Sequence, residues 1–234
     1  MIMRTCGTTV TGPRHIALGE PNQDACLIAG WRGGWIAAVA DGLGSRPLSA
    51  IGAREACRAA RRNLRNGLSS ENVGSLLAGI HQDWVQAVSP RTADEVATTL
   101  IVGRIDRLGS GFIAQIGDGL ALVRESGKFR CLTPPRAGFG NQTDALTADH
   151  RLDRWNSDTV KLTEPGDGIV LMTDGVGDDI EPDRLPDFVD ALYRNVVRRS
   201  RRQGRRWLAM ELADWATPMH SDDKSLAAVF RVKQ

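Results

Sequence analysis

Three short apolar runs in this chain each end in Asp-Gly, and this shared ending constrains the fold more than any other feature. The runs cover residues 35–40, 112–117 and 168–173, and they precede Asp41, Asp118 and Asp174. Each run is typical of a buried β-strand because it is apolar, short and followed by a turn residue. A carboxylate at the end of such a strand is costly unless it is paired or binds a cation. The pattern therefore predicts strands that end at acidic groups with a shared partner.

A divalent cation is the partner that this pattern favours. No Lys or Arg is adjacent to any of the three Asp-Gly pairs. Mg²⁺ and Mn²⁺ are hard cations that prefer carboxylate oxygen ligands. Asp-Gly is also a common hairpin dipeptide, so a plain turn stays open as an alternative for Asp118, which has glycine on both sides. The sequence thus indicates a metal-dependent enzyme of phosphate chemistry.

Length and charge narrow the class of protein. A chain of 234 residues with 41% hydrophobic content can bury a real core. The net charge of +2 is too small to imply a nucleic-acid partner, which makes nucleic acid an unlikely ligand. No apolar stretch approaches the roughly 20 residues of a membrane span, and the N-terminus lacks the apolar region of a signal peptide. We therefore expect a cytoplasmic protein without membrane partners.

The pattern of predicted elements indicates an α+β fold. Strands are expected at residues 24–28, 35–40, 98–105, 111–116, 120–125, 128–132, 159–162, 169–173 and 225–232. Helices are expected at residues 49–64, 71–88, 183–200 and 206–216, and an irregular loop at residues 134–158. Helices in pairs between hairpin-linked strands are unlike alternating βαβ units. No linker or repeat divides the chain, so we expect a single domain over residues 1–234.

Six short motifs, taken in order, resemble a known family. They read Asn-Gln-Asp-Ala at 22–25, Val-Ala-Asp-Gly-Leu-Gly at 39–44, Ala-Thr-Thr-Leu at 97–100, Ile-Gly-Asp at 116–118, Met-Thr-Asp-Gly at 172–175 and Asp-Asp-Lys-Ser at 222–225. Together they are similar to the successive motifs of the metal-dependent type 2C (PPM) serine/threonine protein phosphatases, and bacterial members look closest. The resemblance covers about residues 7–232 and implies a four-layer αββα sandwich of two antiparallel β-sheets flanked by pairs of helices.

The resemblance also implies a metal centre at one end of the sandwich. Asp41 would bridge two Mn²⁺ or Mg²⁺ ions, and the Gly42 carbonyl would bind one of them. Asp174 and Asp222 would complete the protein ligands of the other ion, and Asp118 with Asp174 could hold a third. Asp24 would hold metal-bound water.

The resemblance implies an activity as well. Phosphoserine and phosphothreonine in proteins would be hydrolysed by a metal-activated bridging water, so phosphorylated proteins are the expected partners. Asp24, Asp41 and Asp174 are then the predicted catalytic residues.

The chain departs from the family pattern near the phosphate. Gly19 stands where many members carry a phosphate-binding Arg, and Gln23 replaces the usual Glu before Asp24. Arg14 and His15 are the nearest basic candidates for binding the substrate phosphate. A surface Arg and a structural His are equally compatible with the sequence. These departures leave open an alternative, a non-catalytic relative that binds phosphoproteins.

Two further segments carry weaker signals. The glycine-rich residues 138–143 resemble a flap beside the active site but are also compatible with an ordinary surface connection. Seven arginines between residues 194 and 206 could bind nucleic acid, an acidic protein or an anionic membrane. Such a run is also typical of the solvated C-terminal end of a helix, and Gly204 suggests that a helix ends there. A hydrolase of nucleotides or nucleic acid is the hypothesis that this run would favour.

Overall fold

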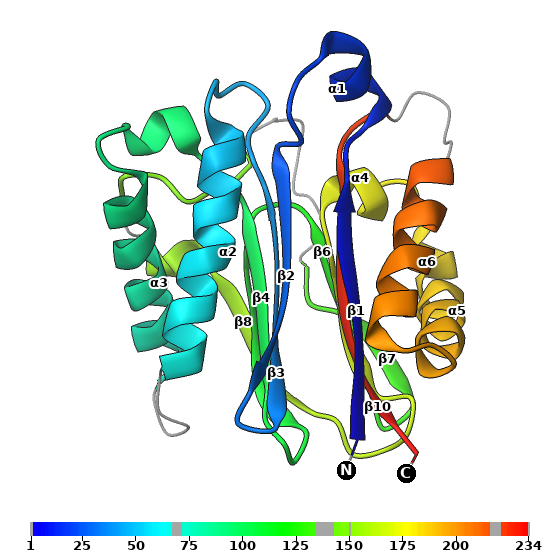
Figure 1. The fold of residues 1–234 in the computed structure, drawn as a ribbon. Coiled ribbons are helices and arrows are strands. Elements are labelled where there is room, and N and C mark those ends of the chain that lie inside the picture. The colour runs from blue at the N-terminus through cyan, green and yellow to red at the C-terminus, as the bar shows by residue number, and fades with distance from the viewer. Residues whose placement is uncertain (1, 67–71, 134–142, 150, 216–220, 234) are drawn as a thin grey trace.

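Two antiparallel five-stranded sheets face each other at the centre of the molecule (Figure 1). The computed structural model describes residues 2–66, 72–133, 143–149, 151–215 and 221–233. The first sheet has the order β1 (Ile2–Val10), β10 (Lys224–Val232), β9 (Gly168–Met172), β6 (Leu120–Glu125) and β7 (Lys128–Cys131). The second has the order β2 (Asp24–Trp31), β3 (Gly34–Asp41), β4 (Leu100–Ile105), β5 (Ser110–Ile116) and β8 (Asn156–Lys161).

Helices cover both outer faces of the sheet pair. The helices α2 (Ser49–Asn66) and α3 (Val73–Val88) pack on the second sheet, while α5 (Leu185–Val197) and α6 (Arg201–Asp214) pack on the first. The expected α+β sandwich of four layers is therefore confirmed. Among the described residues, no helix is both long enough and apolar enough to cross a membrane.

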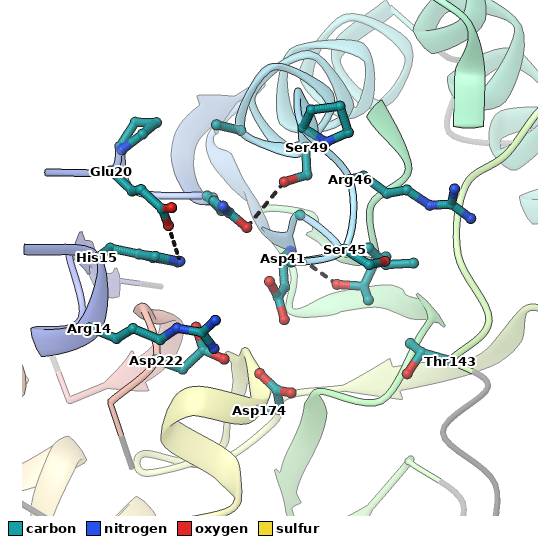
Figure 2. A pocket seen from close by; sticks show the side chains of 18 of the residues that line it. Arg14, His15, Glu20, Asp41, Ser45, Arg46, Ser49, Thr143, Asp174 and Asp222 are labelled. Carbon is teal, nitrogen blue, oxygen red and sulfur yellow. Dashed lines mark hydrogen bonds and ion pairs between the residues drawn. The ribbon is translucent and has the colours of Figure 1, made fainter. Parts of the chain in front are cut away.

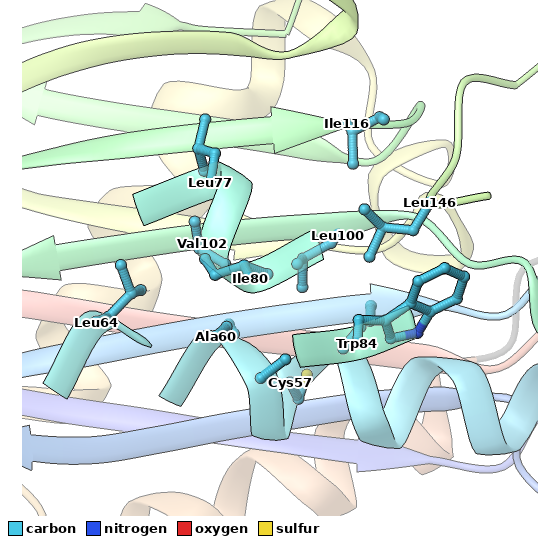
Figure 3. Close-up of a cluster of buried hydrophobic side chains, with 14 of the residues drawn as sticks. Cys57, Ala60, Leu64, Leu77, Ile80, Trp84, Leu100, Val102, Ile116 and Leu146 are labelled. Atoms are coloured by element: carbon cyan, nitrogen blue, oxygen red, sulfur yellow. The ribbon is translucent and has the colours of Figure 1, made fainter. Parts of the chain in front are cut away.

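Three buried clusters hold the four layers together. Between the sheets lie aliphatic side chains such as Ile113, Leu171 and Val229. The cluster under α2 and α3 combines small residues of α2 with Trp84, which is fully buried and donates its ring N–H to the Gly52 carbonyl at 3.1 Å (Figure 3). Full burial of each large aliphatic side chain contributes roughly 1.5–3 kcal/mol, so these clusters form a rigid frame for the strand ends.

Several elements were not predicted from the sequence. Strand β1 pairs with β10 over its whole length, from Ile2 opposite Val232 to Val10 opposite Lys224. A short helix α1 (Pro13–Leu18) follows β1, and another, α4 (Asp174–Gly177), follows β9. The prediction of an irregular loop over residues 134–158 is partly wrong, because β8 begins at Asn156 and forms the edge of the second sheet.

The arginine-rich run does not end a helix at Gly204, and that interpretation is wrong. Ser200 caps the start of α6, accepting a hydrogen bond from the Gln203 N–H while the Gln203 side chain accepts from the Ser200 N–H. Such a capping box marks a helix start. Gly204 is buried inside α6, where a side-chain carbon would lie 3.5 Å from Cys6 Sγ. The arginines after Ser200 therefore occupy the first turns of α6.

Candidate metal centre

Strand ends bring four carboxylates to one cavity at one end of the sandwich (Figure 2). Asp41 is the last residue of β3, Asp118 lies two residues beyond β5, Asp174 opens α4 after β9, and Asp222 lies two residues before β10. All four line a cavity of about 750 Å³, together with Gly42. The predicted metal ligands are thus brought together, although they are spread over most of the chain.

Asp24 lies behind this cavity and does not line it. Its backbone pairs directly with that of Asp41 across β2 and β3, and the residue is only 5% exposed. The Thr173 hydroxyl donates a hydrogen bond of 2.8 Å to Asp24 Oδ2, and Thr173 Oγ1 in turn accepts from the Ser225 N–H at 3.0 Å. Asp24 therefore connects β2, β9 and β10 beneath the ligands.

Two threonines hold the backbone of Asp41 in place beyond the end of the β3–β4 pairing. Thr99 Oγ1 accepts from the Asp41 N–H at 3.0 Å, and the Thr99 N–H donates to the Asp41 carbonyl at 2.8 Å. The Thr98 hydroxyl donates to the same carbonyl at 2.8 Å. The Ala-Thr-Thr-Leu motif thus has a structural explanation, because it fixes the position of the central carboxylate.

The carboxylates repel one another in a poorly solvated place. Burial raises the pKa of Asp41 well above its usual range, and the negative charges of Asp24 and Asp174 add to this effect. Burial also raises the pKa of Asp174, and the charges of Asp118 and Asp222 raise it further. Stabilising the charged forms requires an opposite charge close by.

No protein cation supplies that charge among the described residues. Asp41, Asp118, Asp174 and Asp222 form no ion pair with a Lys, Arg or His in this part of the chain. Several carboxylate oxygens and one backbone carbonyl on a shared cavity form the all-oxygen donor set that Mg²⁺ and Mn²⁺ prefer. The residues present therefore fit hard divalent cations.

Two glycines make the close approach of these elements possible. Gly117 has φ +112°, which favours glycine, and it turns the chain directly before Asp118. At Gly175 a side-chain carbon would lie 2.0 Å from the Asp223 carbonyl oxygen. Any other residue at position 175 would push α4 away from the segment that carries Asp222.

The connection between β1 and β2 forms one wall of the cavity and carries both basic candidates. The Arg14 side chain is exposed in the cavity. The Arg14 backbone N–H donates to the Ser221 carbonyl at 3.1 Å, directly beside Asp222. His15 is only 7% exposed, with Nδ1 2.9 Å from Asp223 Oδ2 and Nε2 3.7 Å from Glu20 Oε2. His15 is therefore held between two carboxylates, whereas the Arg14 side chain points into the cavity (Figure 2).

Asp223 organises this wall, although the sequence alone did not predict a role for it. Its two side-chain oxygens accept from the Gly12 N–H at 2.7 Å and the Gln23 N–H at 2.6 Å. His15, Asp222 and Asp223 each place a potential ligand atom within 4.8 Å of the other two. Because Asp223 already accepts two backbone hydrogen bonds, we interpret it as an anchor of the β1–β2 connection. The sequence signal for Asp223 is its position in the Asp-Asp-Lys-Ser motif, directly after the predicted ligand Asp222.

Two further residues line the cavity, and only one of them belongs to a segment that the sequence singled out. Arg46, in the connection between β3 and α2, lies across the cavity from Arg14 (Figure 2). The Thr143 hydroxyl donates a 2.7 Å hydrogen bond to Asp118 Oδ2. The Asp118 carboxylate is therefore held by a residue outside its own turn. Thr143 belongs to the segment interpreted as a flap, but residues 138–142 lie outside the described residues. No sequence pattern indicated Arg46, because its distance from Asp41 depends on the path of the connection.

Gly19 and Gln23, the two residues that depart from the family pattern, both lie in the described part of the structure. Gly19 ends α1 with φ +67°, and no atom would contact a side-chain carbon placed there within 4 Å. Gln23 lines the cavity and accepts a 3.2 Å hydrogen bond from the Ser49 hydroxyl through Oε1. Gln23 therefore connects β2 to the start of α2.

Comparisons with known proteins agree with this geometry. The family model described as Protein phosphatase 2C matches residues 11–215. No curated protein matches the chain significantly. Among solved structures, the photosystem II phosphatase PBCP is similar with a TM-score of 0.70 and 17% identity, over 98% of this chain and 99% of that one.

Two other solved structures are also similar over nearly the whole chain. PppA, a key regulatory component of T6SS in Pseudomonas aeruginosa, has a TM-score of 0.70 and 18% identity, over 98% of both chains. The catalytic domain of the serine/threonine phosphatase PstP, in complex with two manganese ions, has a TM-score of 0.65 and 16% identity, over 99% of both chains. At these identities the likeness concerns the fold.

Proposed function

The chain belongs to the protein phosphatase 2C family, and we propose that residues 1–234 form one metal-dependent domain that hydrolyses phosphoserine and phosphothreonine in proteins. One observation carries this proposal. Asp41, Asp118, Asp174 and Asp222 line one cavity, and none of them forms an ion pair with a Lys, Arg or His of the described chain. A group of acidic oxygens that forms no ion pair with a protein cation favours a site for divalent metal ions.

The proposed ligands divide between two ions, and two of the carboxylates would also suit a third. Asp41 and the Gly42 carbonyl would hold Mn²⁺ or Mg²⁺ on one side, while Asp174 and Asp222 would hold an ion on the other. Asp118 with Asp174 would hold a third. Such ions, when bound, supply activation of a water molecule and neutralisation of the phosphate oxygens.

The chain itself has to bind and orient the phosphate. Arg14 is suited to this, because a guanidinium forms paired hydrogen bonds with phosphate oxygens and this one is exposed in the cavity beside Asp222. His15 is instead a positioning residue that keeps the Arg14 segment against Asp223. Asp24, buried behind Asp41, would accept hydrogen bonds from water that enters between the ligands.

A protein nucleophile is not part of the proposal. Among the described residues that line the cavity, the hydroxyls come from Ser45, Ser49, Thr99 and Thr143, and His15 is the only histidine. His15 is held by Asp223 and Glu20, and the Ser49 hydroxyl donates to Gln23. A hydroxyl needs an adjacent base to act as a nucleophile, and of these four only Thr143 has one in the described chain, the Asp118 carboxylate, which the proposal assigns to a metal ion. A water molecule is therefore the proposed attacking group.

The test measures phosphate release from an aryl phosphate and from a phosphothreonine peptide, with Mn²⁺, with Mg²⁺ and with EDTA. We expect metal-dependent turnover that is lost in Asp174→Asn. Asp183→Asn is the matched control, because it removes the same charge from an exposed residue in the segment between α4 and α5. Full activity of Asp174→Asn, or turnover that survives EDTA, would contradict the proposal.

The second candidate is a non-catalytic relative that binds phosphoproteins. Gly19 and Gln23 favour it, because one removes the usual arginine and the other removes a charge near the ligands. Titration calorimetry with a phosphothreonine peptide distinguishes the two functions: binding without turnover, in protein that also binds Mn²⁺, would establish the alternative. The cytoplasmic location expected from the sequence stays a prediction.

A further inference from the structure

A second cavity lies on the open side of the sandwich, away from the metal centre. Here β1 and β2, the edge strands of the two sheets, run side by side between α2 and α6 (Figure 1). The cavity has a volume of about 570 Å³. Its floor is formed by residues 5–9 of β1 and 26–28 of β2, and its wall by Arg201, Arg202 and Arg205 of α6. We call it the arginine groove.

The charge of the arginine groove is not balanced within the described chain. None of the described residues that line it carries a carboxylate, and neither Arg202 nor Arg205 forms an ion pair there. Arg201 is held in place, because it donates a 2.9 Å hydrogen bond to the Ile28 carbonyl and lies 5.3 Å above the Trp35 ring. One ordered guanidinium and two uncommitted ones therefore face the same groove.

The local sequence of α6 is unfavourable without an anion. Cations in the first turn of a helix face the positive end of the helix dipole, where acidic residues are preferred. The first turn of α6, which the structure describes in full, contains arginines and no acidic residue. A local rule broken without local compensation is typical of a functional site. An anion bound in the groove would supply the missing compensation.

Thiol chemistry does not account for this groove. Cys6 and Cys26 both line it, but burial raises the pKa of each thiol to about 12. Both therefore stay protonated at neutral pH, although Arg199 and Arg205 partly oppose the shift. The chemistry that the groove offers is the binding of negative charge.

We propose that the arginine groove binds an acidic segment of a protein partner in an extended conformation. The five lining residues of β1 span about 17 Å, which matches roughly five residues of an extended peptide. Edge strands also present backbone N–H and C=O groups to an added strand. The three guanidiniums supply the charge complementarity.

A peptide fits the groove better than a nucleic acid does. The described lining residues include no aromatic ring, so the groove lacks the aromatic platform on which single-stranded nucleic acids usually stack their bases. The net charge of +2 also gives little general attraction for a polyanion. The two strands that form the groove floor also lead to the metal centre along the chain, because β1 continues into the Arg14 segment and β2 begins at Asp24. Binding in the groove does not depend on hydrolysis.

The experiment measures binding of a fluorescently labelled ten-residue Asp/Glu peptide by anisotropy, with the full chain at two salt concentrations. The test variant is Arg202→Ala/Arg205→Ala. The matched control is Arg198→Ala/Arg206→Ala, which removes two exposed arginines of the same run that do not line the groove. We expect the test variant to lose at least about tenfold in affinity, and the control to bind as the wild type does.

Other outcomes would overturn the proposal. Equal binding by both variants, or an equal loss in both, would mean that the groove has no specific role. A single-stranded oligonucleotide that binds more tightly than the peptide, and loses affinity in the test variant, would identify nucleic acid as the occupant. Binding should persist in EDTA, and the test variant should hydrolyse aryl phosphate like the wild type. A protein that binds the peptide without any hydrolysis would contradict only the proposed activity.

Discussion

The metal centre and the arginine groove are two charged cavities of the same sandwich, and they are constructed in opposite ways. The centre collects carboxylates from strand ends far apart in the chain, behind which Asp24 is buried. The groove takes its charge from three exposed arginines within five residues of α6. Buried like charges need a rigid frame and a partner to stay charged, whereas water solvates exposed charges, so they stay charged before a partner binds. Charge removal should therefore affect the two regions differently.

The largest expected effect is that of Asp41→Asn. Loss of the central ligand should lower metal-dependent hydrolysis at least about a hundredfold. In EDTA the same variant should unfold at a higher temperature than the wild type, because burial and the charges of Asp24 and Asp174 oppose ionisation of Asp41. Phosphate release and thermal unfolding measure the two effects. Arg202→Ala should change neither, and a lower unfolding temperature of Asp41→Asn in EDTA would contradict the comparison.

The stability of the metal-free protein should depend on pH through the buried carboxylates. Burial raises the pKa of Asp24 from 3.8 to about 7. Between these values the folded protein binds more protons than the unfolded chain, so the free energy of unfolding falls as the pH rises from about 4 to about 7. Thermal unfolding in EDTA across this range measures the slope, and Asp24→Asn should flatten it. An equally steep fall in that variant would exclude Asp24 as the cause.

Rigidity can be compared with two glycines, one in each region. Gly175→Ala should destabilise the protein by roughly 1–3 kcal/mol, because the added carbon would lie 2.0 Å from the Asp223 carbonyl oxygen. Gly204→Ala should be neutral or stabilising by up to about 1 kcal/mol, since it lies inside α6 and the nearest contact is an ordinary 3.5 Å. Urea unfolding measures both. Similar changes in the free energy of unfolding for both substitutions would show that the two regions do not differ in rigidity.

The smallest expected effect concerns Arg14 at the edge of the metal centre. Arg14→Ala should raise KM for a phosphothreonine peptide roughly tenfold, the loss expected for one charge-assisted contact. Arg14 is exposed, and its side chain forms no ion pair within the described part of the chain, so the unfolding temperature should not change. Steady-state kinetics measure KM and kcat separately. Arg107→Ala, at an exposed position outside the cavity, serves as the control, and an unchanged KM in Arg14→Ala would remove Arg14 from phosphate binding.

Long or strongly apolar elements could be predicted from the sequence, and short or edge elements could not. Strands β3, β5 and β9 were predicted because their apolar runs end in recognisable turn residues. Strand β1 was missed because it is defined by its pairing with β10, at the other end of the chain. Helix α1 is too short to show a helical period, although Pro13 at its start and Gly19 at its end are typical helix signals.

The candidate site divides in the same way. Asp41, Asp118 and Asp174 could be found because an acidic residue directly after a buried strand is unusual. Asp223 and Arg46 could not be ranked, because their roles depend on which segments cross above the strand ends. Sequence left Arg14 and His15 as equal candidates, and the ion-pair distances of His15 separate them.

The sequence by itself determined the α+β class, the strand ends that carry acid and the family of motifs, because these depend on local chemistry and spacing. Tertiary structure alone decided that Asp24 lies behind Asp41, that Asp223 anchors the cavity wall and that the arginines of α6 face a groove between two sheet edges. These are contacts between residues distant in the chain. Their distances follow from how the four layers pack, which no local pattern encodes.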